Sequence, residues 1–411
     1  MFFHIFLGRI ESQRKDLLQT IWLDISLHSL ISNQEDEMAL KRRNFLLGAG
    51  GVAALIGIGG TWRVTRMPTS GVAPWSFDPA PLADIRMEAL RYAILAPNPH
   101  NRQPWLVKFN GPDSVSLYCD PNKRLPQTDP FDRQITIGFG SFIELASIAA
   151  AQRGYRLEVE PCPQGESHLR LDERPVAQLR FVEDKLIPRD PLFTAIPKRH
   201  TNRLVYNPAP PEQLEKLQAS GYTLSADPDL MARIAKIAVA AITVETTTHR
   251  THMESVRLLR IGHEENDALP DGLALSGPVI EATAAIGMTT RESIADPKSS
   301  SFKIGLEGLR ESCGSVPAAL WIDSAANSRA DQIAAGRLYA RAHLRATNLG
   351  LRMHPLSQSL QEYPEMNEHY AAIHSALGVS GQSRIQMLAR VGLAKDAPPS
   401  PRWPVEKHIL R

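Results

Sequence analysis

The sequence has few cysteines and almost no net charge. Its 411 residues include 3 cysteines, Cys119, Cys162 and Cys313, which lie far apart in the chain. An odd and widely spaced set excludes a disulfide framework and a CxxC zinc or redox site. The formal net charge is +2, with 46 Lys and Arg against 44 Asp and Glu. A nucleic-acid-binding protein normally carries a clear basic excess, so we expect no nucleic-acid partner.

Patterns of several hydrolase classes are also missing. Neither GxSxG nor HExxH occurs in the sequence. The spacing of His249 and His252, with His263 nearby, is compatible with a metal, but an exposed helix explains it better. We predict no metal site. With 43% hydrophobic and 22% charged residues, the chain is predicted to be globular, with room for two or three domain-sized units.

An export signal is the clearest feature near the N-terminus. Lys41-Arg42-Arg43 precedes an uncharged, glycine-rich run from Asn44 to Trp62. This pattern resembles a twin-arginine signal, assigned here to residues 38–66. We therefore predict export by the twin-arginine machinery, to the periplasm or to the outer face of the inner membrane. No clear cleavage site follows, which leaves open whether the segment is removed or stays as a membrane anchor.

Two neighbouring segments need separate interpretations. Residues 1–37 are interpreted as a leader added by too early a start, with Met38 as the true first residue. Residues 67–81 are interpreted as a linker. Gly48–Ala53 satisfies the loose GxGxxG/A pattern, but neither a preceding strand nor an acidic residue about 20 positions later supports dinucleotide binding.

From residue 82 onward the apolar patterns predict mixed helices and strands without regular alternation, hence an α+β fold. Helices are expected over 83–96, 132–153, 211–220, 230–244, 251–261 and 330–348. Strands are expected over 105–110, 114–120, 155–160, 168–172, 176–182, 318–323 and 385–392. The stretch 267–315 is interpreted as loop-rich and as a candidate lid.

Four short segments combine polar or cationic groups with proline or glycine. In Ala96–Trp105, prolines stiffen a loop that carries amides able to pair with a heteroaromatic ring edge. Arg199 and Arg203 flank Thr201 and could hold a phosphate through charge-assisted bonds. Alone, the first fits a structural turn and the second a solvated basic loop.

The third segment is Gly350–Gln358, and the fourth is Arg390-Val391-Gly392 with Ser400–Pro404 downstream. Each could be a simple cap or strand end. In this order, the four segments resemble the nitroreductase superfamily, specifically its Acg-like branch, which often carries a twin-arginine signal. The resemblance covers roughly residues 80–411.

This resemblance implies a flavoprotein that binds FMN, with NAD(P)H as co-substrate. The loop and the arginine segment occur in the reverse of the family's usual order, which two nitroreductase-like halves in one chain would explain. We predict halves at 82–189 and 190–411 that form a monomeric pseudo-dimer, with one complete FMN site between them and a degenerate second one.

The resemblance also assigns roles to residues. The phosphate and ribityl chain are assigned to Arg199, Thr201, Arg203, Arg390 and Arg402. The other side of the flavin is assigned to Pro97, Asn98, Asn101 and Gln103. Backbone groups near flavin N5 are assigned to Pro355, Leu356, Ser357 and Gln358. No catalytic side chain is expected, because the flavin carries the chemistry.

Three functions remain open at this point. The first is ping-pong hydride transfer from NAD(P)H, or from another donor, to a small acceptor such as a nitroaromatic or quinone. Export complicates it, since nicotinamide nucleotides are scarce outside the cytoplasm. The second is a flavin-sequestering protein closed by a lid, with little turnover. The third is a membrane-anchored scaffold without cofactor.

Overall fold

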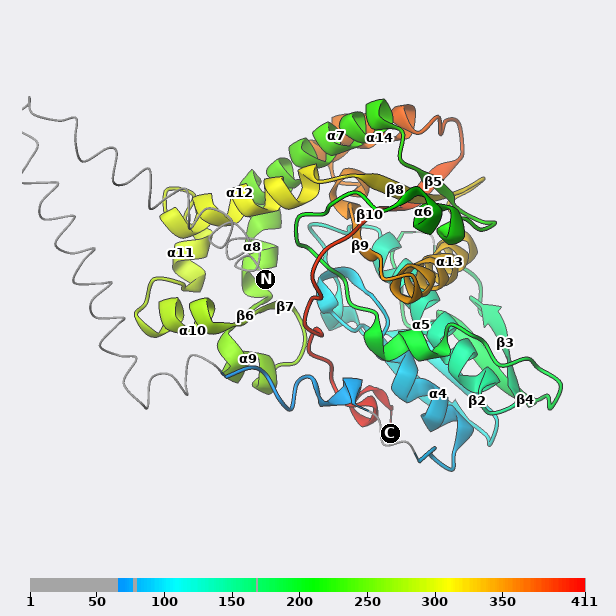
Figure 1. Cartoon of the computed structure of the whole chain (residues 1–411). Helices are drawn as coiled ribbons and strands as arrows, with labels where there is room; N and C mark the ends of the chain where they lie inside the picture. Colours follow the sequence, from blue (N-terminus) through cyan, green and yellow to red (C-terminus); the bar gives the residue numbers. More distant parts are fainter. Residues whose placement is uncertain (1–65, 77–79, 168, 411) are drawn as a thin grey trace, which may run out of the picture.

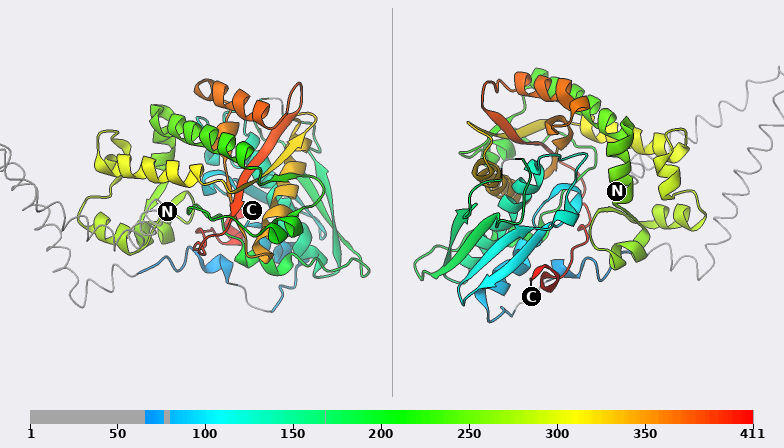
Figure 2. Two further views of the ribbon diagram at one scale, coloured as in Figure 1. Left: turned by 45° about the horizontal axis from the view of Figure 1, so that its top comes forward. Right: turned by 180° about the vertical axis from the view of Figure 1, so that it is seen from behind.

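The computed structural model describes residues 66–76, 80–167 and 169–410. The proposed leader and all but the last residue of the proposed export signal lie outside these residues. The described chain has the expected α+β fold, in which two tandem halves, each with a four-stranded antiparallel sheet, pack against each other (Figure 1). An insertion of short helices, residues 249–314, lies to one side of the two sheets in each view (Figures 1 and 2).

The first sheet has one solvated face. It consists of β1 (Trp105–Asn110), β2 (Ser114–Cys119), β4 (Ala177–Glu183) and β3 (Tyr155–Pro161), in that order. Buried and more exposed residues alternate along β1 and β4, as expected where only one face packs on the core. That core is formed with α4 (Ile85–Ala93) and α5 (Arg133–Ala151).

The second sheet is covered on both faces. Its order is β5 (Thr223–Ser225), β8 (Ala318–Ser324), β10 (Arg384–Gly392) and β9 (Arg352–Pro355). All but the first residue of β10 are buried, including the polar Gln386 and Arg390, as expected for a strand covered on both faces. One side packs with α6 (Pro211–Leu217) and α13 (Arg329–Asn348), and the other with α7 (Pro228–Thr247) and α14 (Asn367–Ala376).

Helices α5 and α13 cross at the centre and join the two halves. Gly140 and Gly336 face each other at the crossing. A Cβ on Gly140 would lie 2.1 Å from the carbonyl oxygen of Ile333, and one on Gly336 would lie 2.0 Å from that of Ile137. Only glycine allows this approach. By length and composition α5 could span a membrane, but here it is the buried core helix.

The insertion corrects one prediction. Residues 267–315, expected to be loops, contain β7 (Leu273–Leu275), α10 (Pro278–Ala285), α11 (Arg291–Ala295) and α12 (Ser300–Gly314). Before them come α8 (His249–Arg257), β6 (Leu259–Ile261) and α9 (Gly262–Ala268), and β6 pairs with β7 in parallel. The helix predicted over 251–261 was therefore wrong in its second half, because the chain turns at Leu258 into β6.

Most of the other predicted elements match the structure to within a few residues, but the ten-residue α14 was not predicted. The strand predicted over 168–172 was wrong for Leu169–Asp172: Leu169 and Arg170 form a bend, and the next two residues are in no helix or strand. The main-chain amide of Leu171 bonds to the carboxylate of Asp132 rather than to a strand. The strands β5, β6, β7 and β9 were missed because each has only three or four residues. The exact bounds of the two halves remain a prediction.

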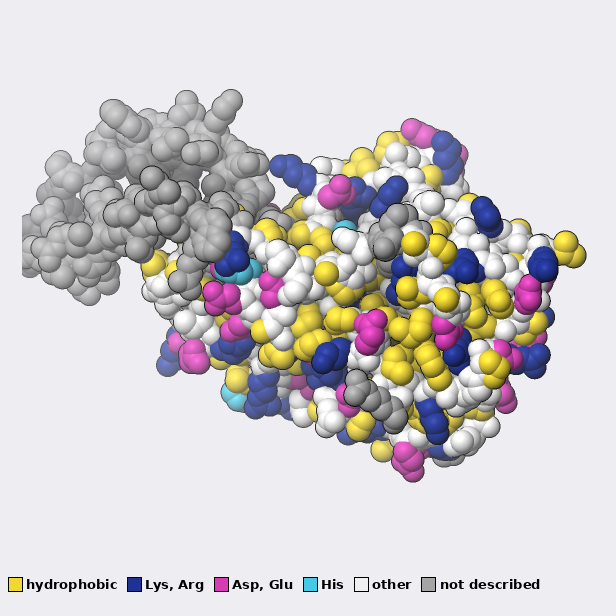
Figure 3. Space-filling model, turned by 90° about the horizontal axis from the view of Figure 1, so that it is seen from below, with side chains coloured by type: hydrophobic (Ala, Val, Ile, Leu, Met, Phe, Trp, Pro, Cys, Tyr) yellow, Lys and Arg dark blue, Asp and Glu magenta, His cyan; other side chains and the backbone are white. Residues whose placement is uncertain are grey.

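The C-terminal tail returns to the first half. The amide of Leu410 donates to the carbonyl of Val107 in β1 at 2.8 Å, and that of Arg402 donates to the carbonyl of Gly71 at 2.7 Å. The tail and the segment 66–76 run along the lower edge in Figure 1. Seen from below, hydrophobic side chains gather on this face between scattered charged ones (Figure 3).

Candidate functional site

The loop after α4 has an unusual backbone. His100, Asn101 and Gln103 have φ values of 47°, 52° and 50°, in the left-handed region that residues other than glycine rarely adopt. The side-chain oxygen of Asn98 accepts a hydrogen bond from the amide of Gln103 at 2.8 Å and closes the loop. Strained conformations of this kind persist where surrounding contacts fix them, and they cluster at functional sites.

The side-chain amides of two residues in this loop form hydrogen bonds to distant segments of the chain. Gln103 is 2% exposed; it donates to a main-chain carbonyl of the insertion at 2.8 Å and accepts from the amide of Trp403 at 2.9 Å. Asn101 donates to the carbonyl of Pro401 at 2.8 Å and accepts from the side chain of Arg402. Both amides therefore position the loop.

Arg402 is buried and binds main-chain carbonyl groups of the first half. Its Nε donates to the carbonyl of Ile94 at 3.0 Å, and its Nη2 donates to that of Ala96 at 3.2 Å. Burial lowers the pKa of its guanidinium well below the ordinary value. These bonds tie the C-terminal tail to the end of α4 and to the loop that follows.

Arg199 lies in the same buried layer. Its Nη2 donates to the carbonyl of Leu95 at 2.9 Å, and its Nε and Nη1 have no hydrogen-bond partner in the described part of the chain. Burial lowers the pKa of Arg199 to about 10, so the group stays charged at neutral pH. It adds positive potential behind the loop.

Thr201 and Arg203 reach a pocket because Asn202 between them is anchored inward. Asn202 is fully buried. Its main-chain N–H donates to the carbonyl of Met353 at 3.2 Å, and its side-chain Nδ2 donates to the carbonyl of Lys395 at 2.6 Å. Thr201 and Arg203 both line the pocket. Burial lowers the pKa of Arg203 from its ordinary value.

Arg390 supports the pocket from behind. Its Nε donates to Nδ1 of His354 at 3.1 Å, and its Nη2 donates to Oγ of Ser312 at 2.7 Å and to the carbonyl of Leu204 at 2.8 Å. Accepting at Nδ1 leaves the proton of the neutral ring on Nε2. Burial, followed by the charge of Arg390, lowers the pKa of His354 well below its ordinary value.

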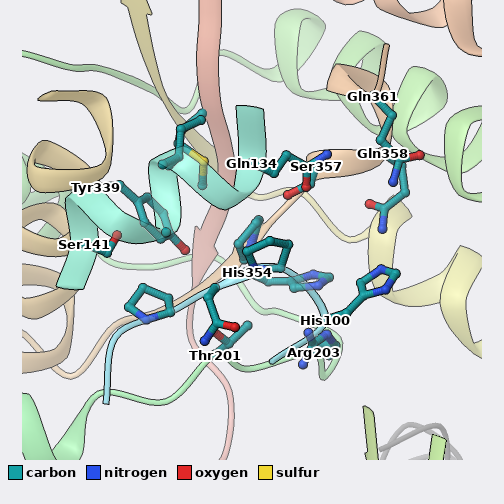
Figure 4. A pocket seen from close by; sticks show the side chains of 17 residues that line it. His100, Gln134, Ser141, Thr201, Arg203, Tyr339, His354, Ser357, Gln358 and Gln361 are labelled. Carbon is teal, nitrogen blue, oxygen red and sulfur yellow. The ribbon is translucent and has the colours of Figure 1, made fainter. Parts of the chain in front are cut away.

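The pocket lies where the two halves meet. Figure 4 shows Tyr339 and Ser141 on one side and His100 and Arg203 on the other. Three segments and the two central helices contribute its walls. The lining residues are Pro97, Asn98, Pro99, His100, Gln134, Ile137, Gly138, Ser141, Thr201, Arg203, Tyr339, His354, Pro355, Ser357, Gln358, Gln361 and Met387.

The pocket is polar and favours an anion. Burial lowers the pKa of His100 to about 4, and His354 is neutral for the reason given above. Of the residues that line this pocket, Arg203 is then the one that carries a formal charge. No partner is found among the described residues for Nδ1 of His100, the hydroxyl of Tyr339 or Oε1 of Gln361. These atoms are available to a bound molecule.

Two further cavities adjoin the pocket at Arg203. The polar pocket has a volume of about 120 Å³, and its neighbours have about 450 and 220 Å³. Arg203 lines all three. Ligand pockets commonly measure roughly 300–1,000 Å³, so a cofactor-sized molecule would extend from the polar pocket into a neighbouring cavity.

The site residues predicted from the sequence divide into two groups. Those on the pocket wall are Pro97, Asn98, Thr201, Arg203, Pro355, Ser357 and Gln358. Those that lie behind the wall and hold it are Arg199, Asn101, Gln103, Leu356, Arg390 and Arg402. The placement gives the second group contacts to protein groups; their assignment to the flavin remains a prediction.

Several lining residues were missed. Gln134, Gly138 and Ser141 interrupt the apolar sequence of α5 with small or polar residues at helical spacing, and this was a readable signal. Tyr339 gave none, because a tyrosine in a long helix is normally a packing residue. His354 stood inside a recognised segment without an assigned role.

The prediction of an exposed histidine helix is correct for His249 but wrong for the other two histidines. His252 and His263 are 9% and 5% exposed. His252 bonds through Nε2 to the carbonyl of Ile294 at 3.0 Å, and Nδ1 of His263 lies 3.0 Å from a carboxylate oxygen of Glu281. Both rings hold the insertion together. No group of three or more His, Cys, Asp or Glu within residues 66–76, 80–167 and 169–410 is arranged to hold a metal.

Comparison with known proteins agrees with this geometry. A Mycobacterium tuberculosis protein provisionally named NAD(P)H nitroreductase Rv3131 is 26% identical over 350 residues, covering 79% of this chain and 93% of that protein. The provisional NAD(P)H nitroreductase Acg of the same organism is 25% identical over 334 residues, covering 79% and 95%. Over most of its length the chain is similar in sequence to these two provisionally named nitroreductases. No family model matches the chain.

Solved structures show weaker likeness. A structure from Anabaena variabilis, described only provisionally as a nitroreductase, has a TM-score of 0.39 and 11% identity, covering 80% of this chain and 93% of that one. The FMN-dependent nitroreductase NfnB from Mycobacterium smegmatis, solved with NADPH, has a TM-score of 0.30 and 14% identity, covering 52% and 94%.

Proposed function

We propose that the chain is an FMN-dependent oxidoreductase of the nitroreductase type. In this proposal it takes hydride from NAD(P)H, or from another donor, and passes electrons to a small electron-poor acceptor such as a nitroaromatic or quinone. The observation that carries the proposal is one pocket, lined by Asn98 of the first half and Thr201 of the second, in which Arg203 is the charged residue. The provisional names of the curated relatives support it.

The donor set of the pocket fits FMN. The Arg203 guanidinium and the Thr201 hydroxyl suit a phosphate, which prefers charge-assisted bonds. The amides of Gln134 and Gln361 suit the pyrimidine edge of a flavin, which both donates and accepts. When bound, FMN supplies reversible hydride acceptance at N5.

The chain's own residues bind and orient. Arg203 is held in place by the inward anchoring of Asn202. The neutral rings of His100 and His354 keep further positive charge out of the pocket. Ser357 and Gln358 also line the pocket and offer polar groups that do not ionise.

Export by the twin-arginine route is part of the proposal. It rests on Arg42, Arg43 and the uncharged run after them. The route carries folded proteins, which suits a chain that takes up its cofactor before crossing the membrane.

Replacing Arg203 tests the site. Full-length protein is purified, and FMN per chain is read from the absorption spectrum and from titration of flavin-depleted protein. We expect one FMN per chain, and binding about 10- to 100-fold weaker in Arg203→Met, since a charged bond contributes about 1.5–3 kcal/mol. Arg189→Met, at an exposed arginine, is the matched control. Colourless wild-type protein, or equal FMN affinity in Arg203→Met, would refute the proposal.

A second candidate is flavin sequestration with little turnover. The helices of the insertion line a cavity that shares His100, Arg203 and Gln358 with the polar pocket, so they could restrict access to it. Anaerobic mixing with NADPH separates the two functions. Bleaching of the flavin supports the oxidoreductase, and a persistent yellow colour supports sequestration.

A further inference from the structure

The side-chain amide of Gln361 connects the polar pocket to a buried carboxyl group. Gln361 is buried and lines the pocket, near Gln358 on the same segment (Figure 4). Its Nε2 donates to Oε2 of Glu245 at 2.6 Å, and its Oε1 has no hydrogen-bond partner among the described residues. The bond to Glu245 thus leaves the accepting end of this amide for a molecule in the pocket.

The residues on both sides of Gln361 are held by α5. Nη2 of Arg133 donates to the carbonyl of Leu360 at 2.6 Å, and its Nε lies 3.0 Å from a carboxylate oxygen of Glu362. The main-chain N–H of Gln361 donates to the carbonyl of Gln358 at 3.1 Å. With the main chain fixed, the softest motion of the buried side chain is rotation about its last torsion, which is broad and roughly two-fold. That rotation exchanges Oε1 and Nε2.

The charge of Glu245 decides which end of the amide it accepts. Glu245 lies on α7, is 7% exposed and also bonds to the side chain of Gln358. An ionised carboxylate can only accept hydrogen bonds, so it requires Nε2 of Gln361. A neutral carboxyl group also donates and can pair with Oε1 instead. The orientation of the amide is therefore coupled to the protonation of Glu245.

We propose that Glu245 is a positioning residue that sets the hydrogen-bonding character of the polar pocket through Gln361. Ionised Glu245 keeps Oε1 available to the pocket as an acceptor, and neutral Glu245 lets the amide rotate and offer Nε2. The ionised form thus selects a ligand with an N–H donor at this place, as the pyrimidine ring of a flavin has. The choice of ligand rests on the proposed function, whereas the coupling of the amide to the carboxyl group is a property of the protein alone.

Glu245 ionises in an accessible pH range. Burial raises the pKa of Glu245 to about 7, and the charge of Glu254 acts in the same direction. The carboxyl group is therefore neutral below about pH 7 and ionised above it, so binding of an N–H donor should strengthen as the pH rises through this value.

The other ionisable groups around Glu245 are shifted by burial as well. The pKa of the thiol and of the phenol named below is raised, and that of the two imidazoles is lowered, in each case away from neutrality. The pKa of the guanidinium is lowered from its ordinary value. The groups that act on Glu245 or line the same space are Glu254, Cys313, Tyr363, His252, His100 and Arg203.

The coupling is tested first without cofactor. Full-length, flavin-depleted protein is labelled with nitrogen-15 at glutamine, and the side-chain signal of Gln361 is identified as the one lost in Gln361→Met. In the wild type this signal should shift with a midpoint near pH 7, and in Glu245→Gln it should not shift between pH 6 and pH 8. A signal that stays constant in the wild type, or that moves equally in Glu245→Gln, would overturn the proposal.

The consequence for the pocket is tested by FMN binding at pH 6 and pH 8. The phosphate group of FMN also titrates, at about pH 6, so the quantity compared is the ratio of wild-type affinity to variant affinity at each pH. Relative to Glu245→Gln, the wild-type affinity should rise about three- to fivefold from pH 6 to pH 8, as expected for about one hydrogen bond.

A double-mutant cycle assigns this effect to Gln361. In a Gln361→Met background, Glu245→Gln should no longer change the pH dependence, because the amide that transmits it is absent. The matched control is Glu281→Gln. Glu281 is also buried and accepts from the main-chain N–H of His263, but it is not among the residues that line the described pocket, so this variant should keep the wild-type pH dependence.

Thermal unfolding checks that every variant folds. If Glu245→Gln does not fold, Gln361→Met takes its place as the reference and should lack the wild-type pH dependence. The proposal is overturned if FMN binding has the same pH dependence in the wild type and in the reference, or if Glu245→Gln keeps its effect in the Gln361→Met background. Wild-type protein that binds no FMN would refute the proposed redox function, and the nitrogen-15 titration would still decide whether Glu245 orients Gln361.

Discussion

Helices α5 and α13 hold matching positions in the two halves but present different side chains. Each begins with a buried arginine, Arg133 or Arg329, and each carries its crossing glycine at the same distance from that start. Arg133 donates to the carbonyl of Leu360 at 2.6 Å, in the opposite half. Arg329 likewise donates to the Thr136 hydroxyl, at 3.2 Å. The two helices therefore share the buried arginine at the start, its bond to the opposite half, and the glycine at the crossing.

The two helices differ at three other matching positions. Where α5 presents Gln134, Gly138 and Ser141 to the polar pocket, the matching positions of α13 carry Ala330, Ala334 and Arg337.

The guanidinium of Arg337 lies 2.7 Å from Glu144, which also pairs with Arg341 at 2.7 Å. A pocket on the α13 side would have to accommodate these ion pairs. The comparison teaches that the crossing supports the fold on both sides, and that the choice of side chains restricts the polar pocket to one of them.

Disrupting the shared crossing should have the largest effect. In Gly336→Val the new Cβ would collide with the carbonyl of Ile137, which belongs to a helix backbone and cannot move alone. We expect a loss of about 3 kcal/mol or more in the free energy of unfolding, measured with urea. Ala334→Val adds the same side chain on the exposed face of the same helix and should change stability by less than about 1 kcal/mol. Similar losses in both variants would mean that the crossing is not tight.

Making α5 resemble α13 should close the polar pocket. Ser141→Arg places at the pocket wall the residue that α13 has at the matching position. If FMN binds there as proposed, its affinity should fall about 100-fold, a free-energy change of about 2.7 kcal/mol.

The control for this exchange is Ala334→Arg, on the exposed face of α13, which should keep its FMN. Circular dichroism would establish that both variants fold. Retention of wild-type affinity in a folded Ser141→Arg variant would move the cofactor elsewhere.

The starts of the two helices should respond differently to pH. Helix α13 begins with a capping box of Ser328 and Asp331, whereas the amides of Gln134 and Ile135 in α5 donate to Asp129 at 3.1 and 2.9 Å. Burial raises the pKa of Asp129 from 3.8 to about 6. The folded state thus binds this proton more tightly than the unfolded state, and the stabilisation is lost as the pH rises from about 4 through 6.

Asp129→Asn cannot ionise, so its stability relative to the wild type should improve by about 1–2 kcal/mol between pH 4 and pH 8. Urea unfolding at both values measures this difference, from which any pH-independent cost of the amide cancels. A difference that does not change with pH would show that Asp129 keeps an ordinary pKa.

Removing one of the ion pairs of α13 should have the smallest effect. The side chain of Arg341 is 31% exposed and pairs with both Glu144 and Asp190. Arg341→Met leaves Arg337 with Glu144, so we expect a loss of only about 0.5–1 kcal/mol that shrinks in 1 M salt. A loss as large as that of Gly336→Val would make these ion pairs, rather than the glycines, the centre of the interface.

Periodicity predicted the long elements well because their burial follows one face. The 19-residue α5 and the 9-residue β10 carry apolar patterns that local sequence shows directly. The short strand pairs and the helices of the insertion could not be predicted in this way, since their stability depends on contacts such as that between β6 and β7.

The candidate site likewise has features that the sequence could predict and features that it could not. The segments around Asn98, Thr201 and Ser357 were recognisable as motifs, and the structure gathers them at one pocket. Which arginine reaches that pocket was not predictable. Arg203 and Arg402 look alike in sequence, and only the distant carbonyls around Arg402 show that its charge is used inside the protein. The cavity of about 450 Å³ was also unpredictable, because its walls come from segments as far apart in the sequence as His100 and Gln358.

The hydrogen bonds between the tail and the first half have a consequence for biosynthesis. Asn101 and Gln103 bond to Pro401 and Trp403, which are synthesised 300 residues later. The geometry of the loop cannot be completed before that later part of the chain has been made, so loading of any small molecule into the pocket must wait for it. A polypeptide cut short before Pro401 would lose these bonds and, with them, the finished loop.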